Sequence, residues 1–269
     1  MPRPCHVVYL LHSLGRGGTE NGVVNLLNRL DRDRFRFTIA LIQRERSMLE
    51  RVERDGVRVV TVGKRWGNDP LFPIRLTQLF RKEQPDIVHT RGFACIEGIP
   101  AARLAGVPAI VHSEHGRDVD EAQRLKPRRA ALRRLLYKMA DVVVTVSEEL
   151  RNSLLTQVRS SPSQMICLPN GVDLERFREL PEAADARAAL GLPQQGLLIG
   201  SVGRHDPVKD YGSLLRAFVR LRADHAGLGL VLCGDGPQHQ ALRDAAAALG
   251  VAEDVHFLGF RDDIESVLS

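Results

Sequence analysis

Short apolar runs alternate along the chain with longer segments in which apolar residues recur at helical spacing. The runs are almost continuously apolar, as parallel strands are when helices cover both faces of the sheet. This alternation predicts a doubly wound α/β sheet. Strands are expected at 6–11, 37–42, 57–62, 86–90, 109–113, 141–146 and 165–169. Helices are expected between them, at 19–30, 46–55, 74–84, 95–105, 128–139 and 148–157.

A second series of the same kind follows, after a stretch rich in Ala, Pro and charge. That stretch, RELPEAADARAALGLPQQG, predicts a linker with a short helix. We therefore expect two Rossmann-like domains, 1–178 and 179–269. The second domain reaches only about three strands, so we expect it to be incomplete. Its strands are expected at 196–202, 229–234 and 255–259, and its helices at 211–223 and 237–249.

Composition narrows the class of protein. Of the 269 residues, 43% are hydrophobic, enough for a sizeable core, and the net charge of +5 suits an anionic ligand or a membrane surface. The cysteines, Cys5, Cys95, Cys167 and Cys233, form no CxxC pair, which argues against a zinc ribbon or a thioredoxin-type site and favours reduced core thiols. We find no uncharged apolar run near the ~18 residues of a spanning helix. The amino-terminal HVVYLLHSL predicts a strand, not a signal peptide.

A glycine-rich turn, in the stretch HSLGRGGTENGVV, links the first strand to the first helix. Free backbone N–H groups and the positive helix end make such a turn a phosphate site, although its glycines could serve close packing alone. The GxGxxG fingerprint of nicotinamide-binding folds fails. Counted from Gly15, its third glycine position holds Glu20, and the second strand runs into Gln43 and Arg44 instead of an acidic residue. A Walker motif is also absent from the sequence.

The loop after strand 196–202, GRHDPVK, carries Arg204 and Lys209. Ligands of open α/β sheets bind at the carboxyl ends of the strands, where this loop lies. Arginine can fork two phosphate oxygens and lysine acts as a point charge, so the pair predicts a diphosphate grip. The alternative is a solvated loop with two surface cations.

These motifs, in this order and spacing, resemble the family 4 (group 1) retaining glycosyltransferases of the GT-B fold, and in particular the sugar transferases of exopolysaccharide gene clusters. The resemblance covers nearly the whole chain. The motifs that carry it are GGTE (17–20), SEHGRD (113–118), VSEEL (146–150), PNGVDLERF (169–177), LGLP (190–193), GRHDPVK (203–209), GDGP (234–237) and VHFLGFRDDI (255–264).

The resemblance implies transfer of a sugar, with retention, from a nucleoside-diphosphate sugar to a glycan or lipid-linked acceptor in polysaccharide biosynthesis. The first domain would be the acceptor side and the second the donor-binding domain. The nucleotide sugar is a substrate, and we expect no cofactor and no metal, because Arg204 and Lys209 would stabilise the leaving diphosphate. The donor site implied by the resemblance lies near Gly17, Gly18, Glu20, Gly203, Gly234, Gly236, Phe260 and Arg261.

His115 is the residue that the resemblance places against the donor sugar; a plain structural role is the alternative. An H-x-x-H metal pair with His112 lacks a pattern for a third ligand. Glu20 could equally complement the helix dipole as a first-turn acid.

Two departures from the family pattern stand out. Lys209 is followed by Asp210 where the family has glycine, and no Glu-x7-Glu element follows residue 260. We therefore keep two alternatives: a truncated, non-catalytic fragment that binds acceptor or membrane, and a GT-B nucleotide-sugar epimerase.

The segment 124–140 holds seven basic residues and no acidic one. Its leucines at 132, 135 and 136 and Met139 share one helical stripe, which predicts either a helix on anionic lipid headgroups or an ordinary surface helix packed on the sheet. Reduced thiols fit a cytoplasmic protein, and the first reading of this helix places it peripherally at the inner face of the membrane. Because no aromatic platform interleaves the charges and aromatic residues make up only 5% of the chain, nucleic acid is not an expected partner. The candidate membrane residues are Arg129, Arg133, Arg134 and Lys138.

Overall fold

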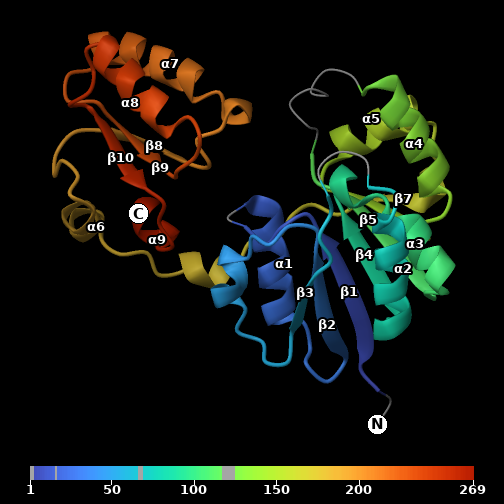
Figure 1. The fold of residues 1–269 in the computed structure, drawn as a ribbon. Helices are drawn as coiled ribbons and strands as arrows, with labels where there is room; N and C mark the ends of the chain where they lie inside the picture. Colours follow the sequence, from blue (N-terminus) through green and yellow to red (C-terminus); the bar gives the residue numbers. More distant parts are fainter. Residues whose placement is uncertain (1–2, 16, 66–68, 117–124) are drawn as a thin grey trace. The chain divides into compact units, whose positions relative to one another are not determined.

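The computed structural model describes residues 3–15, 17–65, 69–116 and 125–269. The chain divides into two compact units, Met1–Val172 and Asp173–Ser269 (Figure 1). Residues 173–178, which the sequence analysis assigns to the first domain, group here with the second unit. Arg176, in the short 3-10 helix Leu174–Phe177, explains this grouping, because its Nη2 donates to both carboxylate oxygens of Glu265 at 2.9 Å.

The first unit holds one parallel sheet of seven strands, in the order β3-β2-β1-β4-β5-β6-β7. The strands predicted from the apolar runs are confirmed. Strand β1 pairs with β2 on one side and with β4 on the other, so the strand order reverses between β1 and β4. Open α/β sheets bind their ligands at such a switch point. The strands are β1 (Cys5–Leu11), β2 (Phe35–Leu41), β3 (Arg58–Thr61), β4 (Ile87–Arg91), β5 (Ala109–Glu114), β6 (Val142–Thr145) and β7 (Met165–Cys167).

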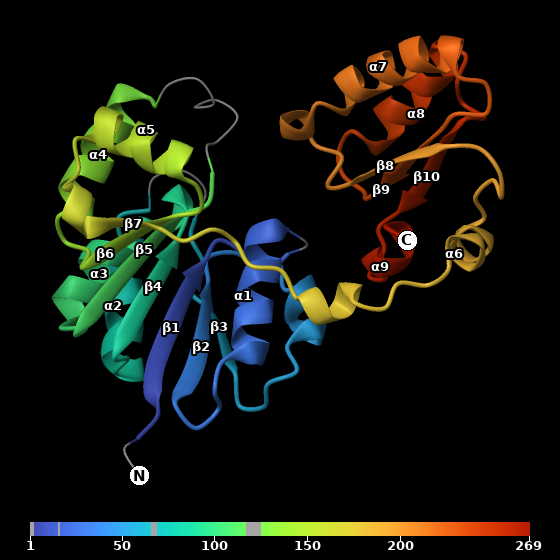
Figure 2. The ribbon, with the colours of Figure 1, turned by 180° about the vertical axis from the view of Figure 1, so that it is seen from behind.

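Helices cover both faces of this sheet (Figures 1 and 2). Alternate residues of β1 therefore enter different cores. Val8 and Leu10 belong to the core that includes Phe72, whereas Val7 and Tyr9 belong to the core on the other face. Burial on both sides is why the strands are continuously apolar in sequence. The α-helices of this unit are α1 (Gly18–Arg29), α2 (Phe72–Glu83), α3 (Gly98–Ala105), α4 (Pro127–Tyr137) and α5 (Glu148–Val158).

The helix predicted at 46–55 is wrong: the segment forms only a 3-10 helix, Ser47–Arg51. Arg54 gives the physical reason. Its buried guanidinium donates to the carbonyl of Leu30 at 2.6 Å and to that of Leu27 at 3.3 Å, and so satisfies acceptors at the carboxyl end of α1. The helical conformation ends at Arg51, and this places the Arg54 side chain against the carboxyl end of α1.

The second unit has a parallel sheet of three strands, in the order β10-β9-β8. Helices α7 and α8 pack side by side on one face, and Phe218 and Leu242 join the strands in a single core (Figure 1). The predicted linker helix is also present. The elements are α6 (Ala183–Leu190), β8 (Leu198–Val202), α7 (Tyr211–Asp224), β9 (Gly229–Cys233), α8 (His239–Ala248), β10 (Val255–Gly259) and α9 (Ile264–Val267).

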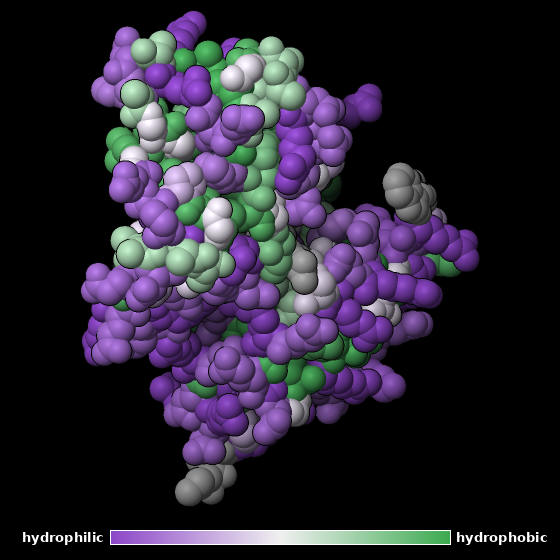
Figure 3. Space-filling view, turned by 90° about the vertical axis from the view of Figure 1, so that its left-hand side faces the viewer, coloured by the Kyte–Doolittle hydropathy of each residue, from purple (hydrophilic) through white to green (hydrophobic). Residues whose placement is uncertain are grey.

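The surface shown in Figure 3 is mostly hydrophilic, with apolar residues gathered in smaller patches. Single exposed apolar residues are ordinary on a folded protein. Among the described residues, every helix is too short or too polar to cross a membrane.

Candidate functional site

Backbone hydrogen bonds join the loops that follow β8, β9 and β10 in the second unit. Gly203 N–H donates to the carbonyl of Cys233 at 2.9 Å, and His205 N–H donates to that of Asp235 at 2.9 Å. Gly234 N–H in turn donates to the carbonyl of Gly259 at 2.7 Å. These loops therefore form one surface at the carboxyl edge of the sheet, and this surface holds every donor-site residue predicted in the second domain.

Gly234 and Gly236 allow the close approach of the first two loops. Their φ angles are +140° and +154°, a range that other residues rarely adopt. A Cβ at Gly234 would lie 2.0 Å from the carbonyl oxygen of Gly203, and one at Gly236 would lie 2.5 Å from that of His205. Any side chain here would push the GRHDPVK loop away from the GDGP turn.

Arg204 and Lys209 are both exposed on this loop. The Arg204 guanidinium is held 3.0 Å from Asp206, and the Asp206 carboxylate accepts from Val208 N–H at the start of the 3-10 helix Pro207–Lys209. The Lys209 side chain turns back toward Gly203, whose Cβ position is 3.9 Å from Lys209 Cε. The structure thus brings both cations to the carboxyl edge of β8, where they remain accessible.

Asp210 explains one departure from the family pattern. Its φ is +48°, in the left-handed region that favours glycine and that aspartate tolerates better than most residues. Its carboxylate accepts from Ser213 N–H at 3.3 Å and so caps α7, and the side chain and then the backbone of Ser213 lower the pKa of Asp210. The carboxylate cap stabilises this left-handed conformation at a position where the family has glycine.

Phe260 and Arg261 follow β10 on the same edge, and Phe260 is 38% exposed. The Arg261 guanidinium donates to both carboxylate oxygens of Asp263, at 2.8 and 2.7 Å, and this partner raises the pKa of Arg261. The side chain of Arg261 is thus engaged with Asp263 next to the end of the strand.

His205 lies inside the GRHDPVK loop, and sequence reasoning gave it no role. The side chain is fully buried, and its Nδ1 lies 3.0 Å from Nδ1 of His239 at the start of α8. The rings of Tyr211 and Phe257 surround it, at centroid distances of 4.9 and 6.3 Å. Burial, followed by the charge of His239, lowers the pKa of His205. His205 therefore anchors the loop that carries the two cations.

In the first unit, Gly17 precedes α1 and Gly18 begins it. The Glu20 carboxylate lies over this end of the helix, as the position of a Cβ at Gly17, 2.4 Å from Glu20 Oε2, shows. An acid in this position stabilises the positive end of the helix. This placement agrees with the dipole reading of Glu20, and it also puts a carboxylate at the turn that was predicted to face the donor.

His115 follows β5 at the carboxyl edge of the first sheet, beside Arg91 at the end of β4. Arg91 Nε donates to His115 Nε2 at 2.9 Å, and Arg91 Nη2 lies 3.3 Å from His115 Nδ1. Burial, together with the charge of Arg91, lowers the pKa of His115 to about 4. Sequence reasoning missed Arg91. The available signal was a charged residue that ends an apolar strand beside the switch point.

The neighbouring His112 is fully buried and faces other partners. Its Nδ1 is 2.7 Å from Thr90 Oγ1, and its Nε2 is 3.5 Å from Glu114 Oε1. Both ring nitrogens are therefore engaged, so His112 does not form a metal pair with His115. Arg117 and Asp118, the last two residues of SEHGRD, lie outside the described residues, as does Arg124 of the basic segment.

Glu114 is the centre of a buried polar network. Its Oε1 accepts from Arg133 Nε at 2.9 Å and from the Tyr137 hydroxyl, both on α4. Burial alone would raise the pKa of Glu114, but the hydrogen bonds and charges of His112 and Arg133 outweigh it and hold the value at about 2. The network fastens the end of β5, and with it the backbone at His115, to helix α4.

The membrane assignment of Arg133 is consequently wrong, since this side chain is 3% exposed and paired with Glu114. Arg129 also turns inward. Its guanidinium and that of Arg133 lie over the ring of Phe93, at 4.8 and 4.3 Å from the ring centroid, respectively. Arg134 and Lys138 remain exposed. The helix also exposes two leucines that were predicted to share the stripe with the buried Leu136, namely Leu132 at 38% and Leu135 at 62%.

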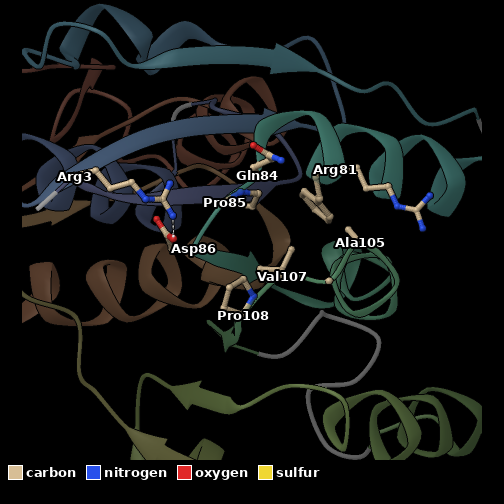
Figure 4. A pocket seen from close by; sticks show the side chains of 10 residues that line it. Arg3, Arg81, Gln84, Pro85, Asp86, Ala105, Val107 and Pro108 are labelled. Atoms are coloured by element: carbon tan, nitrogen blue, oxygen red, sulfur yellow. Dashed lines mark hydrogen bonds and ion pairs between the residues drawn. The ribbon is translucent and has the colours of Figure 1, made fainter.

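A hollow at the opposite, amino-terminal edge of the first sheet lies away from these residues (Figure 4). Arg3 pairs with Asp86 at 2.6 Å on its rim, and Arg81 donates to the carbonyl of Leu104. Because the ligand edge of a parallel sheet is the carboxyl one, we assign no role to this hollow. Its lining includes Phe80, Gln84, Pro85, Ala105, Val107 and Pro108.

Comparison with known proteins supports the sequence resemblance. Residues 16–176 match the profile described as Glycosyltransferase Family 4, and residues 182–269 match that of Glycosyl transferases group 1. The Bacillus subtilis glycosyltransferase EpsF is 30% identical over 97% of this chain and 70% of its own length.

Two further relatives carry more detailed names. An Escherichia coli enzyme named UDP-Gal:alpha-D-GlcNAc-diphosphoundecaprenol alpha-1,3-galactosyltransferase is 28% identical over 86% of this chain. A Mycobacterium tuberculosis enzyme named GDP-mannose-dependent alpha-(1-6)-phosphatidylinositol monomannoside mannosyltransferase is 35% identical over 71% of this chain. The matched regions span 63% and 49% of these two relatives.

Solved structures show the same fold. Anabaena HepE in complex with UDP and glucose matches 98% of this chain and 71% of its own, with a TM-score of 0.81 and 18% identity. The lipopolysaccharide glycosyltransferase WaaG matches 97% of this chain and 72% of its own, with a TM-score of 0.71 and 15% identity. These glycosyltransferases have the GT-B fold, and both sheets of this chain conform to it. With its first unit matched by one profile and its second by the other, the chain belongs to glycosyltransferase family 4, of the group 1 glycosyl transferases.

Proposed function

We propose that this chain is a retaining glycosyltransferase, which moves a sugar from a nucleoside-diphosphate sugar to a glycan or lipid-linked acceptor in polysaccharide biosynthesis. The observation that carries the proposal is the loop with Arg204 and Lys209, held against the GDGP turn at the carboxyl edge of β8. The names of the relatives agree with it, because they specify UDP-galactose or GDP-mannose as donor and lipid-linked acceptors.

The chemistry assigns separate tasks to the two units. As the bond between the anomeric carbon and the diphosphate oxygen breaks, the diphosphate takes the electron pair and gains negative charge. Arg204 and Lys209 would stabilise that charge without a metal ion. His115 in the first unit would contact the sugar, with Gly17 and Gly18 at the neighbouring helix end.

Proton NMR of the protein with UDP-glucose, UDP-galactose or GDP-mannose tests this function. Slow transfer to water should release a free sugar whose first-formed anomer keeps the configuration of the donor. Arg204→Ala and Lys209→Ala should each slow this release by about a hundredfold, the usual effect of removing one charge-stabilising donor. Arg222→Ala, which removes a cation paired with Asp254 at the far end of α7, should have no effect.

Other outcomes of the same experiment would replace the proposal. Release of the opposite anomer first would mean inversion. Interconversion of one nucleotide sugar into another without release of nucleotide would identify an epimerase. Nucleotide binding without any turnover would leave a non-catalytic binding chain.

We also propose that the protein is cytoplasmic and associates peripherally with the inner face of an anionic membrane through the exposed face of α4. Leu132 and Leu135 lie there among the exposed Arg134 and Lys138, an arrangement suited to headgroups and the acyl boundary. The protein should sediment with phosphatidylglycerol vesicles at low salt and not with phosphatidylcholine vesicles. The double variant Leu132→Ser/Leu135→Ser should lose this binding, whereas Leu104→Ser, at a leucine of α3 that is 66% exposed, should retain it. Equal sedimentation of all three proteins would refute the assignment.

A further inference from the structure

The contact between Arg91 and His115 restricts the charge of the imidazole ring. A guanidinium has donors only, so a ring nitrogen that accepts from it must be unprotonated. Arg91 donors face both ring nitrogens, with Nε 2.9 Å from His115 Nε2 and Nη2 3.3 Å from Nδ1, so the unprotonated nitrogen of a neutral ring accepts from the guanidinium. A protonated ring would offer Arg91 no acceptor and add a second positive charge beside it.

Arg91 itself is well fixed. It is 9% exposed, as the last residue of β4 next to the switch point. Its Nη2 lies 4.0 Å from the Cβ position of Gly22, so the guanidinium reaches the first turns of α1. The titratable groups that act on Arg91 are Tyr9 on β1, Glu20 on α1 and Cys95 in the 3-10 helix Phe93–Cys95. Those around His115, besides Arg91, are Glu114 and His112 on β5 and His89 on β4.

We propose that Arg91 is the positioning residue of His115: it fixes the plane of the ring and keeps the ring uncharged at the edge where the sugar is bound. The reason for such a device lies in the reaction. Departure of the diphosphate leaves positive charge on the sugar ring, as in other glycosyl transfers with oxocarbenium-like transition states. A charged imidazole would oppose that charge, whereas a neutral one can hydrogen-bond to the sugar without doing so.

The use made of the neutral ring rests on the proposed function, but its protonation state does not. NMR of the histidine ring nitrogens on the intact chain, from pH 8 to pH 5, reads that state without substrate. The chain has nine histidines, and the His115 signals are those missing from His115→Asn. In the wild-type protein we expect His115 to stay neutral down to pH 5.

In Arg91→Met the His115 pKa should rise by roughly one unit or more, the usual effect of removing a like charge at this distance. Arg103→Met, which removes an arginine that contacts Met139 and Asp141 on other elements, should leave the titration unchanged. If Arg91→Met does not fold, Arg91→Lys keeps the positive charge, and the ring should stay neutral down to pH 5.

Titration of wild-type His115 near its ordinary value, or an unchanged titration in a folded Arg91→Met protein, would overturn the proposal. A protein that turns over a nucleotide sugar gives a second readout. The wild-type kcat should then be level from pH 8 to pH 5, whereas that of Arg91→Met should fall below about pH 6 with KM unchanged. Absence of turnover would count against the proposed function, and the titration would still decide the role of Arg91.

Discussion

Replacement of Glu114 by glutamine should destabilise the first unit, because it removes the buried negative charge that pairs with Arg133. The magnitude follows from the pKa of Glu114, which is about 2 in the folded chain against an ordinary 4.5. A lowering of this size corresponds to roughly 3 kcal/mol of folding free energy at neutral pH. Glutamine keeps the shape of the side chain, so the loss isolates the charge.

The pH dependence carries a definite sign. Because the folded pKa is the lower one, the stabilisation by Glu114 is complete above pH 4.5 and is lost as the pH falls toward 2. The difference between wild type and Glu114→Gln should therefore shrink from about 3 kcal/mol at pH 7 to about 2 kcal/mol at pH 3.5.

Native-state hydrogen exchange is the suitable assay, since a global melt would mix the two compact units. The amides of β5 and β6 report the opening of the first unit, and those of β9 serve as an internal control that should not change. Glu175→Gln, at an exposed pair with Arg178, should cost less than about 0.5 kcal/mol. In the background Arg133→Met the effect of Glu114→Gln should become smaller but not vanish, because His112 still interacts with Glu114. A loss at pH 7 no greater than that of Glu175→Gln, or one that grows as the pH falls, would refute the reasoning.

Further predictions concern separate parts of the chain. Gly234→Ala and Gly236→Ala should each cost about 1–3 kcal/mol from backbone strain alone and abolish nucleotide binding, whereas Gly200→Ala, whose Cβ position is open, should keep binding in calorimetry. Cys95 is fully buried, and burial raises its pKa to about 12. In native protein at pH 8, iodoacetamide should therefore leave Cys95 unlabelled over hours while the half-buried Cys167 reacts. Labelling of Cys95, detected by mass spectrometry, would contradict this prediction. Arg54→Met should lower the free energy of unfolding by about 2 kcal/mol or more, measured by exchange of α1 amides, since it strips the carbonyls of Leu27 and Leu30 of their donor.

The sequence was sufficient for the sheets, and the reason is physical. Strands covered on both faces are apolar at almost every position. Strand β1 places Val8 and Leu10 in one core and Val7 and Tyr9 in the other, so it appears in the sequence as a continuous apolar run. The carboxyl edge of a parallel sheet is also where ligands bind, so the sequence was sufficient to place the loops with Arg204 and His115 at such an edge.

Contacts that join distant residues could not be predicted in this way. Hydrophobic periodicity grouped the leucines of α4 in one stripe, but the helix is turned so that Arg133 reaches Glu114, 19 residues away in the chain. Arg54 ended the expected helix at 46–55 for a similar reason, by capping α1. Arg91 and His115 meet across 24 residues, and nothing in the local spacing of either indicates the other.

The central claim is that the loop of Arg204 and Lys209 binds the diphosphate of a nucleotide sugar, and calorimetric titration of the chain with UDP and with GDP tests it most directly. The account predicts binding of one of them by the wild-type protein, weakened at least tenfold by Arg204→Ala and by Lys209→Ala and unchanged by Arg222→Ala, because each lost charge-assisted contact is worth about 1.5–3 kcal/mol. Equal affinity in the wild type and in both loop variants would contradict it.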